Sequence, residues 1–132
     1  MENINNDKKL AKLLESINEE YSIGELKGSY VNKDGELKIY FNINSFIFTL
    51  VMIKSKYDEV YEHIAKGRER LARNKIIDFI IKCLEGVDMK YMFDNYYDPE
   101  NETHHPFELV DYLRVLDHYI KDLLKDLKSD QN

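Results

Sequence analysis

Apolar residues near the start of the chain recur at intervals of three and four. This spacing places them on one face of a helix. The residues concerned are Leu10, Leu13, Leu14, Ile17 and Tyr21. Gly24 follows, and glycine favours the end of a helix. The pattern predicts an amphipathic N-terminal helix within residues 1–23.

From Glu25 onward the spacing of apolar residues changes to two. Leu37, Ile39, Phe41 and Ile43 alternate with more polar positions, which is typical of a half-buried strand. Residues 25–31 precede this strand, and the intervening segment 32–35 ends in Asp-Gly. That dipeptide supplies the positive φ of a short hairpin loop, so we expect an antiparallel hairpin.

Residues 46–53 contain no charge and are β-branched or aromatic almost throughout. They follow a second turn signal at 42–45 and predict a third strand, which completes a sheet over residues 24–54. A helix over 45–54 is the alternative, because short apolar runs fit both structures. As a strand, this segment is apolar on both faces, so we expect helices on both sides of it or a partner's surface.

Residues 55–86 have helical periodicity. Ser55 and Asp58 have the spacing of a capping box, Gly86 is placed to stop the helix, and Gly67 is placed to divide it. The half after Gly67 is apolar nearly all round, so it is expected to be the most buried helix. Cys83 lies in this half and is interpreted as a small buried hydrophobic residue rather than a reactive thiol.

Residues 87–105 have no sustained period and are interpreted as a long acidic aromatic connection. Pro106 then opens a final helix over 106–128, which leaves a tail at 129–132. Apolar residues in this helix alternate in steps of four and three, as in a heptad seam. The seam comprises Leu109, Leu113, Leu116, Ile120, Leu123 and Leu127. It predicts packing along another helix, either within the domain or across a homodimer.

The element order predicts an α+β fold. It consists of a three-stranded antiparallel β-meander with an N-terminal helix, a long or broken central helix and a long C-terminal helix. At 132 residues and 43% hydrophobic content, the chain is expected to form a single domain over 1–132. No apolar run approaches the roughly 20 residues that span a bilayer. We therefore expect a cytoplasmic protein without membrane contact.

The sequence offers little for catalysis. It contains no phosphate-binding glycine loop and no nucleophile motif, and its single cysteine excludes a multi-cysteine metal site. We expect a protein that is not an enzyme and has no cofactor and no metal. A metal-dependent hydrolase that uses His104, His105 and Asp111 is a weaker alternative, because zinc-site spacing is missing.

Negative charge is concentrated in one segment. Residues 88–111 hold seven carboxylates and one lysine, which equals the net charge of −6 for the whole chain. Aromatic residues alternate with the acids there, a combination that suits a basic protein partner. The predicted contact residues are Tyr91, Phe93, Asp94, Tyr96, Tyr97, Asp98, Glu100 and Glu102. The alternative is a solvated loop whose aromatic residues fold back on the core.

Positive charge is concentrated between residues 66 and 75. The members of this basic cluster are Lys66, Arg68, Arg70, Arg73 and Lys75. On a single helix they would form a stripe able to meet phosphates. The alternative is a solvated helix face or a set of internal ion pairs.

These features lead to a ranked expectation of function. The first is a small acidic binding protein, an inhibitor or accessory factor that engages the basic surface of a protein partner, such as a nucleic-acid-handling protein. The Lys-, Asn-, Ile- and Tyr-rich composition is typical of AT-rich genomes and suggests phage or mobile-element origin. The alternative is a nucleic-acid-binding regulator that uses the basic cluster.

Overall fold

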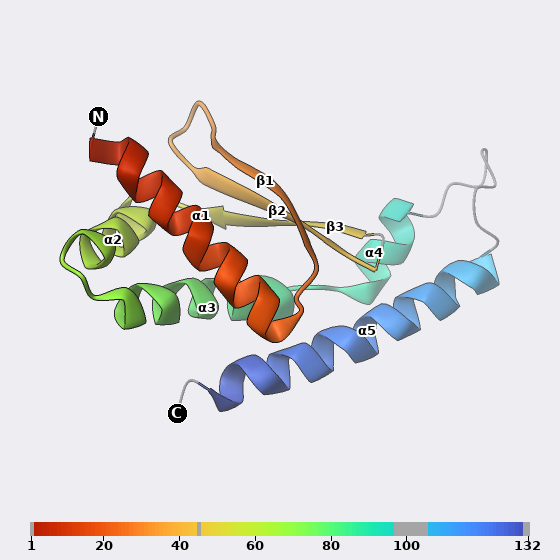
Figure 1. Ribbon diagram of the computed structural model, residues 1–132. Helices are drawn as coiled ribbons and strands as arrows, with labels where there is room; N and C mark the ends of the chain where they lie inside the picture. Colours follow the sequence, from red (N-terminus) through yellow and green to blue (C-terminus); the bar gives the residue numbers. More distant parts are fainter. Residues whose placement is uncertain (1, 45, 97–105, 131–132) are drawn as a thin grey trace.

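Three strands form an antiparallel meander. Most of the helices lie on one side of it, and the short helix over residues 89–96 lies beside the ends of the strands (Figure 1). The computed structural model describes residues 2–44, 46–96 and 106–130. These residues form five helices and the sheet, which confirms the predicted α+β fold. The elements are α1 (Glu2–Tyr21), β1 (Glu25–Val31), β2 (Leu37–Ile43), β3 (Phe46–Met52), α2 (Lys54–Ala65), α3 (Glu69–Glu85), α4 (Met89–Tyr96) and α5 (Pro106–Ser129).

Local turn chemistry sets the register of the strands. The side chain of Asn32 accepts hydrogen bonds from the backbone N–H groups of Asp34 and Glu36, at 3.0 and 2.9 Å. Gly35 supplies a φ of +80° in the same loop, as its Asp-Gly sequence predicts. Between β2 and β3, Asn44 takes a φ of +50°, which suits the short connection.

The sheet buries one face only. Residues of β3 alternate between buried and more exposed positions, with Phe46, Phe48, Leu50 and Met52 facing the helices. Ile47 and Val51 point the other way and are 57% and 41% exposed. The helical alternative for 45–54 is therefore wrong, and so is the expectation of helices on both sides. In the described part of the chain, the helices pack on the face that carries the buried residues of β2 and β3.

The central helix is broken, as Gly67 predicts. Gly67 adopts a φ of +73° between α2 and α3, a conformation that glycine takes without steric cost. The capping box is wrong, because α2 begins at Lys54 and Ile53 precedes it without a side-chain cap. An ion pair between Lys54 and Asp58 at 2.6 Å uses the carboxylate that the capping box assigned to the helix start.

The predicted connection over 87–105 contains a helix. The carboxylate of Asp88 accepts hydrogen bonds from the backbone N–H groups of Lys90 and Tyr91, at 2.9 and 3.4 Å, which is an N-cap. The eight residues of α4 follow. Eight residues give only about two turns, too few for the apolar period to be visible in the sequence.

The heptad seam of α5 is used within the chain. All six seam residues are at most 5% exposed, and α5 contacts α3, α4 and α1. Figure 1 shows α3 between the sheet and α5. Of the two predicted uses of the seam, packing within the domain is the observed one. The seam side chains are therefore not available to a second copy of the chain. In the described part of the chain, no helix is long and apolar enough to span a membrane.

Close contact between chain segments makes one glycine indispensable. A Cβ atom on Gly24 would lie 2.4 Å from the carbonyl oxygen of Asn42 and 2.9 Å from Cγ1 of Ile43. We therefore expect Gly24→Ala to lower the free energy of unfolding by about 1–3 kcal/mol, measured by urea denaturation. Gly86→Ala is the control, because a Cβ there meets its nearest atoms at 3.5 Å. A Gly24→Ala protein as stable as the control would contradict this packing.

Candidate functional site

The helix α4 presents an aromatic and an acidic side chain to solvent from a firmly packed base. Met92 is 7% exposed, and Phe93 packs partly buried against the same core. Tyr91 lies on the outward side and is 63% exposed, and Asp94 is also exposed. The helix therefore holds Tyr91 and Asp94 in fixed relation to the core.

The predicted contact residues have different places in the structure. Tyr91 and Asp94 are exposed, as a contact surface requires, whereas Phe93 is an anchor of α4 on the core. Tyr96 ends the helix. The remaining predicted contact residues, Tyr97, Asp98, Glu100 and Glu102, lie outside the described residues. Within the described residues, the part of the contact segment up to Tyr96 is helical, and Phe93 packs on the core.

A cleft of about 780 Å³ lies between β3 and α4. Its walls are lined by Ile47, Phe48, Thr49, Cys83, Gly86, Val87, Asp88, Tyr91, Met92 and Asn95. Among these described lining residues Asp88 carries the only charge. We refer to this space as the β3–α4 cleft. The sequence did not reveal it, because α4 was not recognised, although the capping residue Asp88 is visible before it.

Cys83 lies at the floor of the β3–α4 cleft. Its Sγ is 3.7 Å from the carbonyl oxygen of Thr49, and burial raises the pKa of the thiol. Since the thiolate is the nucleophile, a raised pKa makes the thiol less reactive. The sequence predicts that Cys83 is a small buried hydrophobic residue. It is only partly buried, and its raised pKa agrees with the expectation that it is not a reactive thiol.

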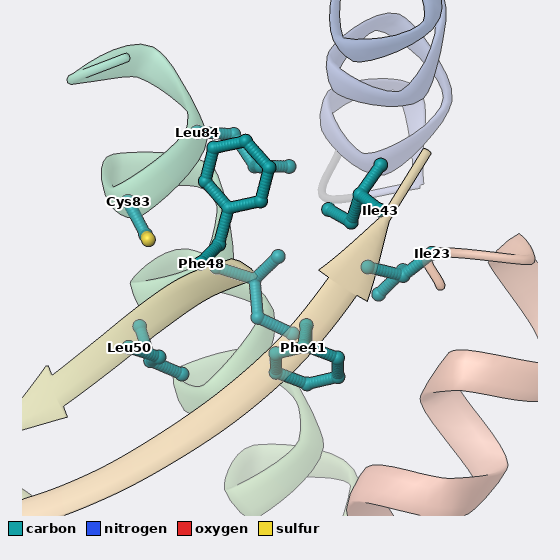
Figure 2. A pocket seen from close by; sticks show the side chains of 8 residues that line it. Ile23, Phe41, Ile43, Phe48, Leu50, Cys83 and Leu84 are labelled. Carbon is teal, nitrogen blue, oxygen red and sulfur yellow. The ribbon is translucent and has the colours of Figure 1, made fainter. Parts of the chain in front are cut away.

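A small enclosed space lies on the other side of Cys83, inside the core (Figure 2). Its volume is about 10 Å³, which is about the space of one water molecule. Phe41 and Ile43 of β2, Phe48 and Leu50 of β3, and Ile80, Cys83 and Leu84 of α3 surround it, together with Ile23. This lining is apolar, so the space is a packing defect and not a ligand site.

The basic cluster does not form one helical stripe. Lys66 and Arg68 flank Gly67 in the turn between α2 and α3. Arg70 is exposed, whereas Arg73 points toward α1 and Lys75 toward α2. The single-helix geometry expected for this cluster is therefore wrong, because Gly67 interrupts the helix.

Most members of the basic cluster are paired with glutamates, some locally and some on other helices. Glu62 lies 2.8 Å from Lys66 and 4.0 Å from Arg68, and the hydrogen bond from Lys66 lowers the pKa of Glu62.

Between helices, Lys75 lies 3.9 Å from Glu59 on α2. Arg73 pairs with Glu20 on α1, and its guanidinium carbon is 5.8 Å from the ring centre of Tyr21. Arg70 has no ion pair within the described residues. This arrangement matches the alternative in which the basic cluster forms internal ion pairs.

Metal ligation finds little support in the part of the chain that the structure covers. No group of three or more histidine, cysteine or carboxylate side chains gathers there. His104 and His105 lie outside the described residues, and Asp111 is exposed on α5.

Comparison with known proteins provides no function for this chain. No protein-family model, no curated protein and no solved structure matches it. The functional argument therefore depends on the residues and geometry described above.

Arg73 connects α1 to α3, so its removal tests the internal role of the basic cluster. We expect Arg73→Ala to lower the free energy of unfolding by about 1 kcal/mol, because it loses an ion pair and a cation–π contact. Arg70→Ala is the matched control and should change stability by less than about 0.5 kcal/mol. Equal effects of the two substitutions in urea denaturation would contradict the internal role of Arg73.

Proposed function

We propose that this chain is a small, non-catalytic binding protein that engages a basic segment of another protein at the β3–α4 cleft. The observation that carries the proposal is the exposed Tyr91, which lines the cleft on a helix anchored by Met92 and Phe93. Asp94 is exposed on the same helix, outside the cleft lining. Tyrosine supplies a large contact area at low entropic cost, and a neighbouring carboxylate steers a basic partner.

Charge supports a basic partner at this cleft. Asp88 is the charged residue among the described lining residues, and the segment 88–111 accounts for the net charge of the chain. A second groove, of about 390 Å³ between α4 and α5, is lined by Lys90 and Arg114 as well as Asp117. Because it carries two bases, that groove is less suited to a basic partner.

A binding protein of this kind acts as an inhibitor or an accessory factor. An acidic surface that occupies a site meant for phosphates would block a nucleic-acid-handling protein. Cytoplasmic location and phage or mobile-element origin belong to this proposal.

Nucleic-acid binding is the less supported alternative. Lys66, Arg68, Arg73 and Lys75 each lie within 4.0 Å of a glutamate, so a phosphate would compete with an ion pair at each of them. Arg70 alone is a weak footprint for a nucleic acid.

Capture from a lysate of the native host tests the proposal. The tagged chain, used with and without nuclease, should retain a basic protein at near-stoichiometric amounts in both conditions. In the double variant Tyr91→Ala/Asp94→Lys the retained amount should fall about tenfold or more, since contact area and favourable charge are both lost.

The control variant is Asp122→Lys, which makes the same Asp-to-Lys charge change at an exposed position on a different helix, α5. It should capture the partner as the native chain does, and circular dichroism should be unchanged in both variants. Capture that survives Tyr91→Ala/Asp94→Lys, or capture lost after nuclease treatment, contradicts the proposal.

A homodimer stays a prediction, but its interface would be the exposed face of the sheet and not the seam of α5. The seam on α5 is buried, which leaves the uncovered sheet face with Tyr30, Ile47 and Val51, exposed by 49%, 57% and 41%. Light scattering should give twice 15.8 kDa, and Ile47→Lys/Val51→Lys should halve the mass by placing charges in the interface. A constant monomer mass at all concentrations would contradict the prediction.

A further inference from the structure

The two edge strands of the sheet differ in how they are protected. β1 has a bulge between Leu26 and Gly28 and carries an ion pair between Lys27 and Glu25 at 3.1 Å. Bulges and charges discourage pairing with a further strand. β3, at the other edge, pairs with β2 in unbroken register and contains no charge, proline or glycine. An edge left in this state is a template for another strand.

The outward-facing backbone groups of β3 belong to Ile47, Thr49 and Val51, and the carbonyl oxygen of Thr49 already accepts a weak hydrogen bond from Cys83 Sγ. In an antiparallel pair, residues alternate between those that bond the neighbouring strand and those that direct N–H and C=O away from it. Ile43 pairs with Phe46 across a connection of two residues. Because the pair that flanks a two-residue hairpin turn is hydrogen-bonded, we infer that 47, 49 and 51 face outward. The contact of Cys83 Sγ with the Thr49 carbonyl oxygen agrees with this direction.

This free edge opens onto the β3–α4 cleft. Ile47 and Thr49 line one side, and Tyr91 and Asn95 of α4 line the other. A further strand would lie about 4.8 Å from β3. The volume of the cleft, about 780 Å³, falls in the range of roughly 300–1,000 Å³ that is usual for ligand sites.

We propose that the basic segment of the partner binds as an extended strand along the free edge of β3, inside the β3–α4 cleft. This inference rests on the proposed function and specifies how that site recognises its partner. Main-chain hydrogen bonds to Ile47 and to the N–H of Thr49 supply affinity, and Asp88 and Tyr91 select cationic side chains.

The chemistry of the edge decides between possible occupants. Main-chain donors and acceptors repeating at the strand period are matched by another extended backbone and not by a compact small molecule. A second β3 would satisfy the same hydrogen bonds, but the strand itself has no charge, and its nearest cation, Lys54, lies beyond its end. An extended basic segment provides both the backbone groups that pair with the edge of β3 and a cation for Asp88.

Amide hydrogen exchange by NMR, on the full chain, tests the inference. In the free protein the amides of Ile47 and Thr49 should exchange faster than those of Phe48 and Leu50, which bond to β2. The probe acetyl-Lys-Val-Lys-Val-Lys-Val-amide should slow exchange at Ile47 and Thr49 by about tenfold or more, because each amide gains a hydrogen bond.

The matched control is the same peptide with N-methyl groups on alternate residues, in both registers. It keeps every side chain and charge but loses backbone donors, so its affinity should fall about tenfold or more. Equal binding of the two peptides, or no binding at millimolar concentration, overturns the inference. Slow exchange at Ile47 and Thr49 in the free protein that disappears on dilution assigns the edge to a second copy and also overturns it.

A variant pair separates this inference from the proposed function. Thr49→Pro removes one outward N–H, a position at which an edge strand tolerates proline, and Thr49→Val keeps it. Loss of the captured partner with Thr49→Pro alone, with circular dichroism retained, supports strand addition. Partner capture that needs Tyr91 and Asp94 but survives Thr49→Pro overturns strand addition and leaves the proposed function standing. Capture that needs none of them overturns the proposed function itself.

Discussion

Burial of one face of the sheet against the helices is the interaction on which the rest of the structure depends. Ile39 and Phe41 of β2 and Phe48 and Leu50 of β3 point into the same core as the apolar side of α3. Each such side chain contributes about 1.5–3 kcal/mol when buried. Because the helices of the described chain lie on this side, the opposite sheet face stays exposed, and the edge of β3 opens onto the cleft beside α4.

The sequence predicted the elements whose pattern is long or whose turns are distinctive. The period of two in β2, the Asp-Gly turn, the break at Gly67 and the seam of α5 each correspond to an observed feature. These signals are local, since they depend on residues a few positions apart. The predicted start of α2 was wrong by one residue. The carboxylate of Asp58, which a capping box would need, instead forms an ion pair with Lys54.

Features that depend on tertiary contacts were not predictable from the sequence. The apolar outer positions of β3 indicated burial on both faces, yet Ile47 and Val51 are exposed. In α4 the pattern is too short to recognise, and its position opposite β3 results from packing of Met92 and Phe93 on the core. The pairing of Arg73 with Glu20 joins residues far apart in sequence, so charge counting alone could not reveal it.

Hydrogen–deuterium exchange of the chain bound to its captured partner, read by mass spectrometry, tests the central claim most directly. The account predicts that protection on binding is concentrated in residues 46–52 and 88–96, which line the two sides of the β3–α4 cleft. Protection centred on residues 66–75, with these two segments unchanged, would contradict it and assign the contact to the basic cluster.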